Sequence, residues 1–190
     1  GFRAAAAETG IPNTSDFNRG NNEGCGYFEV NQKRGVRWSA ADAFLHPVTG
    51  RPNITVLTKA HVRQIRFDGR RVSGLALWHE DKPAEATVTG ELVLASGAIG
   101  SPQLLQLSGV GPAGLLKEIG VPVHRELPGV GENLRDHFVL RMVARIKTMD
   151  TINQRVNGLP LMTEAFKYFT GQPSVLGLSP TLVYIFWKSN

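Results

Sequence analysis

The sequence contains one cysteine in 190 residues, Cys25. A single thiol can form neither an internal disulfide nor a cysteine-based zinc site, so both are excluded and we predict no metal site. The lone cysteine fits a reducing compartment, and we expect a cytoplasmic location. The chain begins with Gly1 rather than Met, which suggests a fragment, so the absence of a signal peptide leaves membrane association as an alternative.

The sequence also lacks long apolar runs and basic tracts. No apolar run approaches the length that a transmembrane helix needs, so we predict no transmembrane segment. The net charge of +5 comes mainly from scattered arginines, and no segment collects five or more basic residues. We therefore expect no nucleic-acid partner and interpret these charges as a solvated surface.

The composition that remains is that of an ordinary globular protein, with 42% hydrophobic and 19% charged residues. Helices are predicted where good helix formers lie between a cap and a glycine, over residues 2–9, 39–45, 102–107, 112–119 and 158–169. Strands are predicted in short runs rich in β-branched and apolar residues, at 27–33, 53–58, 62–67, 72–79, 87–94, 139–146 and 183–187. Asp68-Gly69 is a hairpin signal between two of them. This order predicts a mixed sheet in an α/β protein.

The segment from Glu91 to Pro112 is the most informative part of the chain. Its run of Leu92, Val93 and Leu94 is typical of a strand buried on both faces. The small residues 96–98 follow, and Ser101 then caps a helix with Pro102 at its first position. A strand that leads through a small-residue turn into a helix N-terminus can hold a phosphate or a nucleotide. A plain strand-to-helix connection is the alternative.

The stretch Gly109-Val-Gly-Pro-Ala-Gly114 matches the dinucleotide pattern G-x-G-x-x-G. That pattern needs a strand directly before its first glycine, whereas residues 103–107 are predicted to be helical. We therefore reject the match and interpret it as a turn between two helices.

Several segments together resemble one family. Residues 97–111, GAIGSPQLLQLSGVG, are similar to the second signature of the glucose–methanol–choline (GMC) flavin oxidoreductases. Four further segments fit the family in the same order: Asp16-Phe17-Asn18, residues 37–41 (RWSAA), residues 51–57 (RPNITVL) and residues 128–137 (PGVGENLRDH).

The resemblance implies a mixed α/β fold (α+β in content) with FAD as cofactor. A Rossmann-like FAD-binding domain would take most of residues 1–136. A second, substrate-binding domain with an antiparallel sheet would take residues 137–190 and residues 26–36.

The resemblance also implies cofactor contacts. The backbone of Val62 would meet the adenine end of FAD, and Ser96, Gly97 and Ala98 would lie beside its nucleotide half. The family's catalytic histidine has no match in this chain, so we expect no catalytic residue here and no turnover by the isolated fragment. His137, in the family's Asp-His pair, is expected to pack structurally near the flavin. The other histidines are expected at the surface.

The activity implied is oxidation of a primary alcohol by hydride transfer to the flavin, with oxygen or a quinone-type carrier as electron acceptor. In choline-oxidising members a glutamate two residues after the Asp-His pair holds the trimethylammonium group. This chain has Val139 there, which favours a neutral alcohol as the small-molecule substrate. Two alternatives remain at this point: an FAD-containing hydroxynitrile lyase of the same fold, and an inactive truncated nucleotide-binding module.

Overall fold

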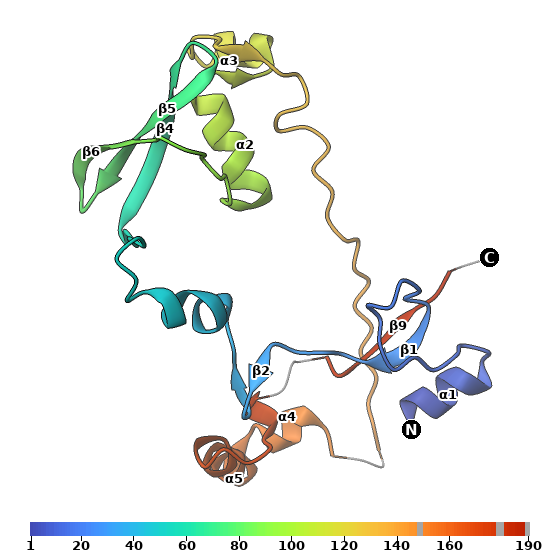
Figure 1. Cartoon of the computed structure of the whole chain (residues 1–190). Coiled ribbons are helices and arrows are strands. Elements are labelled where there is room, and N and C mark those ends of the chain that lie inside the picture. The colour runs from blue at the N-terminus through green and yellow to red at the C-terminus, as the bar shows by residue number, and fades with distance from the viewer. Residues whose placement is uncertain (148–149, 178–180, 189–190) are drawn as a thin grey trace. The chain divides into compact units, whose positions relative to one another are not determined.

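The structure, a computed structural model, describes residues 1–147, 150–177 and 181–188. These residues fall into two units, Thr55–Met142 and Gly1–Ile54 together with Val143–Asn190, which are considered one at a time (Figure 1).

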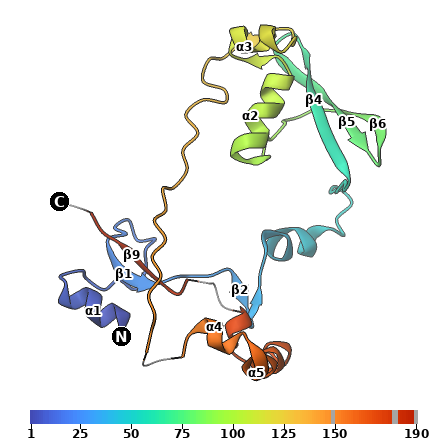
Figure 2. The ribbon, with the colours of Figure 1, turned by 180° about the vertical axis from the view of Figure 1, so that it is seen from behind.

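The unit Thr55–Met142 is built on an antiparallel sheet in the order β4-β5-β6. Its strands are β4 (Ala60–Asp68), β5 (Arg71–His79) and β6 (Lys82–Thr87). The predicted Asp68-Gly69 hairpin joins the first two, and Gly69 has the positive φ, 55°, that such a turn requires. Helix α2 (Gly97–Leu107) packs along β4, and both views show the two side by side (Figures 1 and 2).

The end of α2 leads into a small crossover. β7 (Val110–Gly111) pairs in parallel with β8 (Arg125–Glu126), and α3 (Ala113–Glu118) connects them. The core of the unit lies where this crossover and α2 meet the sheet. Its buried apolar residues are Ile65, Leu77, Leu104, Val110 and Leu116.

The other unit joins segments from both ends of the sequence. β1 (Gly24–Tyr27) pairs antiparallel with β9 (Val183–Phe186), which places Cys25 opposite Ile185. Cys25 is fully buried, consistent with a thiol that packs as a small apolar group. The remaining elements are α1 (Phe2–Glu8), the β2–β3 hairpin (Gln32–Lys33 and Val36–Arg37), α4 (Ile152–Arg155), α5 (Gly158–Phe169) and the 3-10 turn η3 (Val175–Gly177).

Two helix starts in this unit follow from their local sequence. Ser39 and Asp42 exchange backbone and side-chain hydrogen bonds, with Ser39 Oγ donating to Asp42 Oδ2 at 2.6 Å. This arrangement precedes the π-helical turn η1 (Ala41–Leu45) and the 3-10 turn η2 (His46–Val48), so the predicted helix begins as expected but has irregular hydrogen bonding. Thr151 and Gln154 form a complete capping box at α4.

Two predicted strands, 53–58 and 139–146, are wrong, because neither has a strand partner among the described residues. The predicted strand 87–94 is mostly wrong: Thr87 ends β6 and the Val88 amide donates to the Ser73 carbonyl at 2.9 Å, but residues 89–94 form no strand and Val93 is 79% exposed. An extended apolar segment becomes a strand only when a neighbour completes its ladder of hydrogen bonds. The predicted strand 27–33 is also divided, because β1 ends at Tyr27 and residues 32–33 form half of a hairpin.

The predicted start of α2 is corrected as well. The helix begins at Gly97 with Ser96 as its N-cap, five residues before the expected position, so Pro102 lies inside it. Ser101 Oγ accepts a hydrogen bond from the Ser96 amide at 3.1 Å instead of capping the helix. By contrast, α5 covers the predicted residues 158–169, and the mixed helix and antiparallel-sheet content agrees with the predicted fold class.

Candidate functional site

Two of the four predicted cofactor residues line one cleft. Val62, from β4, and Ser96, at the start of α2, both contribute to a cavity of about 1050 Å³ between the helix and the sheet. Leu77 and Leu104 form part of its apolar lining. A volume of this size lies at the upper end of the range for small-molecule and cofactor sites. We refer to it as the α2–β4 cleft.

The two elements present different chemistry to the α2–β4 cleft. β4 has a register shift between Val62 and Gln64, which is a β-bulge that leaves Arg63 as the extra residue. The N-cap of α2, Ser96, makes no side-chain capping bond within the described part of the chain, and the first turn carries no acidic residue. A helix N-terminus in this state favours an anionic group.

The charged side chains that line the α2–β4 cleft are Arg63, Arg66 and Glu85. Arg63 lies over the Trp78 ring, with its Cζ 5.6 Å from the ring centroid. Arg66 pairs with Glu85 at 3.5 Å, but both side chains are more than half exposed, so this ion pair contributes little to stability. The cleft therefore combines an apolar floor, an aromatic ring and positive charge, a combination that fits a nucleotide.

Ala98 lies on a different cleft from Ser96. It lines a cavity of about 780 Å³ together with the loop that contains Gly129, Gly131 and Asn133. Gln106 fastens that loop to α2, because its Nε2 donates to the Val130 carbonyl at 3.0 Å. Gly97, the first residue of α2, has a φ of 79° that favours glycine. The structure thus brings Val62 and Ser96 together and places Ala98 in a second cleft.

A third cavity, of about 1060 Å³, contains none of the predicted cofactor residues. It is lined by residues 90–94 and by the basic side chains of Arg70, Arg71 and Arg125. Residues 90–94 are the apolar segment that lacks a strand partner in the described chain. We therefore attribute this cavity to the unpaired segment beside the sheet and assign it no ligand.

The histidines do not form a catalytic arrangement. The side chain of His137 is 98% exposed. The packing expected for His137 is therefore not seen among the described residues. His124 stacks on Phe67 with centroids 4.2 Å apart, and His46 Nδ1 lies 3.1 Å from Asp42 Oδ1. In residues 1–147, 150–177 and 181–188, no group of three or more His, Cys, Asp or Glu side chains could hold a metal ion.

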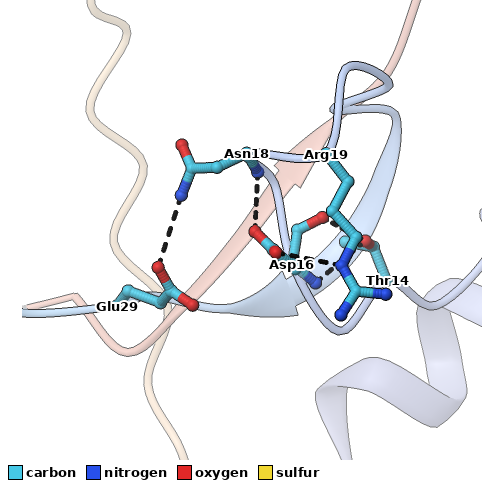
Figure 3. Close-up of polar contacts among 5 residues, drawn as sticks. All are labelled: Thr14, Asp16, Asn18, Arg19 and Glu29. Atoms are coloured by element: carbon cyan, nitrogen blue, oxygen red, sulfur yellow. Dashed lines mark hydrogen bonds and ion pairs between the residues drawn. The ribbon is translucent and has the colours of Figure 1, made fainter.

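The long polar loop before β1 is held by its own side chains (Figure 3). Asp16 Oδ1 accepts the Asn18 amide at 2.7 Å, and Asp16 Oδ2 lies 3.1 Å from Arg19 Nε. The backbone hydrogen bond from Asn18, followed by the contact with Arg19, lowers the pKa of Asp16. Asn18 in turn donates to Glu29 at 3.3 Å, and Thr14 donates to the Asp16 carbonyl at 3.0 Å. These contacts give Asp16 and Asn18 a structural role in shaping the loop.

Sequence reasoning did not find three residues that shape the α2–β4 cleft: Arg63, Trp78 and Ser108. The bulge at Arg63 and the Trp78 contact depend on strand pairing. Ser108 Oγ accepts the Ile65 amide at 2.8 Å, a contact across a long sequence separation. A serine directly after the last turn of a helix was the only local signal.

Comparisons with known proteins identify the family of the chain. The model of the family described as GMC oxidoreductase matches residues 1–139. The "Alcohol dehydrogenase [acceptor]" of Pseudomonas putida is 38% identical over 161 residues, which are 84% of this chain and 29% of that protein. The mitochondrial choline dehydrogenase of Mus musculus is 43% identical over 137 residues, 72% of this chain and 23% of that protein.

A solved structure gives the same result. The FAD-dependent oxidoreductase from Chaetomium thermophilum superimposes with a TM-score of 0.76 at 27% identity, over 91% of this chain and 31% of that protein. The chain therefore spans under a third of the length of each of these three relatives. A family model that covers residues 1–139 is decisive, and the chain belongs to the GMC oxidoreductase family.

Proposed function

We propose that this chain forms part of the cofactor-binding region of an FAD-dependent oxidoreductase that oxidises an alcohol. The observation that carries the proposal is the convergence of Val62 and Ser96 on the α2–β4 cleft, at the N-terminus of α2. The volume of the cleft, its apolar lining and the Arg63 side chain over Trp78 support this proposal, because they suit a nucleotide. The matching solved structure is described as FAD-dependent, and the matching Pseudomonas protein as an alcohol dehydrogenase.

The residues of the chain would divide the binding task between them. The backbone of Val62 would hydrogen-bond one end of the nucleotide, and the first turn of α2, from Ser96 to Ala98, would face its negatively charged part. When bound, FAD supplies the acceptor for the hydride that leaves the alcohol carbon. The chain's own contribution is to bind and orient that cofactor, because none of its histidines matches the family's catalytic position.

A neutral alcohol is the substrate class that we propose. Choline carries a fixed positive charge, and its recognition calls for a nearby anionic or aromatic group. Val139 stands at the position where the resemblance implies a glutamate in choline-oxidising members, and a valine offers no charge. We expect the protein expressed from its complete coding sequence to show a higher kcat/KM for a neutral primary alcohol than for choline. A preference for choline would refute this assignment.

The test of the main proposal is the absorption spectrum of the protein expressed from its complete coding sequence. Oxidised flavin bands that bleach when an alcohol is added without oxygen would support the proposal. A colourless protein that binds no added FAD would refute it. Cyanide release from a cyanohydrin while the flavin stays oxidised would place the protein with hydroxynitrile lyases instead.

None of the helices in the described part of the chain has the length and apolar character of a membrane span.

A further inference from the structure

We infer that Ser108 is a positioning residue for the cofactor: its hydroxyl fixes α2 to the edge of β4 and so sets the width of the α2–β4 cleft. The inference rests on the proposed function, because it assigns the cleft to FAD. Ser108 does not line the cleft. Its effect would pass through the two elements that do.

The hydroxyl of Ser108 makes two hydrogen bonds in a buried setting. It accepts the backbone N–H of Ile65 at 2.8 Å and donates to the carbonyl of Leu104 at 2.6 Å. Ser108 and Ile65 are 4% and 3% exposed. β4 is an edge strand of its sheet, so its outward N–H groups have no strand partner among the described residues. Without the hydroxyl, the Ile65 amide would be left unsatisfied in a buried position, and such groups are costly.

We call the Ser108 contact between α2 and β4 the joint. It lies close to residues that line the cleft, so a change at the joint would alter the width of the cleft. Ile65 is three residues from Val62 along β4, and Leu104 itself lines the cleft. α2 extends for 11 residues from the joint to Gly97, which corresponds to about 16 Å of helix. A tilt of α2 by about 5° at Ser108 would move its N-terminus by about 1.4 Å. A shift of that size separates Ser96 from Val62 by enough to weaken a cofactor that contacts both.

A simpler structural role for the hydroxyl makes a different prediction. If it only capped the helix, its loss would lower stability and leave FAD affinity unchanged. Thr170 provides the matched control, because its hydroxyl also donates to the carbonyl four residues before it, that of Phe166 at 2.8 Å. Thr170 is exposed and ends α5 in the other unit. Thr170→Ala therefore removes the same local bond without touching the cleft.

The experiment compares Ser108→Ala, Ser108→Thr and Thr170→Ala in the protein expressed from its complete coding sequence. We expect Ser108→Ala to raise the FAD dissociation constant about tenfold and to shift the visible spectrum of the bound flavin. Ser108→Thr, which keeps a hydroxyl, should recover most of that affinity. Thr170→Ala should bind FAD as the unaltered protein does.

Hydrogen exchange of the Ile65 amide in the FAD-free protein gives a readout that does not require cofactor. We expect Ser108→Ala to accelerate this exchange about tenfold, with little change at the amides of β5 and β6. If the unaltered protein binds FAD and Ser108→Ala binds it equally well, the inference is refuted while the proposed function stands. If the unaltered protein binds no FAD, the proposed function fails and the inference fails with it. If Ser108→Ala does not fold, the FAD dissociation constant is measured for Ser108→Cys instead. An unchanged FAD dissociation constant in Ser108→Cys refutes the inference.

Discussion

Replacing Gly109 with alanine should strongly destabilise the unit Thr55–Met142. Gly109 follows α2 with a φ of 82°, and an added Cβ would lie 2.5 Å from the Pro122 carbonyl oxygen and 3.1 Å from His124 Cβ. The left-handed conformation costs an alanine about 1–2 kcal/mol. A methyl group forced against backbone adds about 1–3 kcal/mol. The free energy of unfolding should therefore fall by about 2–5 kcal/mol.

Two other glycines separate these contributions. Gly120 follows α3 with a φ of 72°, but no described atom lies within 4 Å of its added Cβ, so Gly120→Ala should cost only about 1–2 kcal/mol. Gly114 lies inside α3 with neither constraint, and Gly114→Ala should stabilise the unit by about 0.5–1 kcal/mol. A true dinucleotide motif would require its third glycine for close packing. The Gly114 variant thus tests our rejection of the G-x-G-x-x-G match.

Urea unfolding followed by the fluorescence of Trp78 measures these changes. Trp38 and Trp187 belong to the other unit, so replacing both with phenylalanine leaves Trp78 as the reporter of this one. Equal losses for Gly109→Ala and Gly120→Ala would refute the steric argument at Pro122. A costly Gly114→Ala would refute our rejection of the G-x-G-x-x-G match at residues 109–114.

Three further predictions follow from single contacts. Val62→Pro, which removes a backbone N–H at the cleft, should abolish FAD binding in a fluorescence titration, whereas Val62→Ile should bind normally. The pKa of Glu164 is lowered from 4.5 to about 2, first by the Val175 amide and then by Lys167. Its carboxylate should therefore stabilise the fold above about pH 4.5 and lose that effect as the pH falls toward 2, and Glu164→Gln should flatten this dependence in acid titrations of unfolding. Cys25, fully buried, should react with a thiol reagent only as fast as its unit opens, and rapid labelling at low denaturant would contradict this.

Features with local signals could be predicted from the sequence. The helix at residues 158–169 is bounded by Gly171 and Pro173, and the hairpin at Asp68-Gly69 needs only a turn dipeptide between two β-rich runs. In both cases the residues that determine the conformation lie within the element or next to it. The structure confirms both.

Features that depend on distant partners could not be predicted. The runs at residues 53–58, 89–94 and 139–146 have strand-like composition, yet none of them pairs with a described strand. Composition indicates that a segment would be stable as a strand, whereas pairing decides whether it becomes one. The candidate site also depends on residues that are distant in the sequence, because Val62 and Ser96 meet only through the packing of α2 on β4. Their assignment came from the family resemblance, and their role in binding FAD stays a prediction.

Residues 97–111 divide into two halves with different roles, and the second half explains why the G-x-G-x-x-G match at residues 109–114 is false. Its first half begins α2 and places Ala98 and Gly100 at the clefts on either side of that helix. Its second half forms the joint, in which Ser108 holds β4 and the Gly109 carbonyl accepts the amides of His124 and Arg125 at 2.8 and 3.0 Å. Position 109 requires glycine because the Pro122 carbonyl oxygen lies where a side chain would begin. A phosphate and a backbone carbonyl impose the same demand on a glycine, so only the preceding element, a helix instead of a strand, distinguishes the two cases.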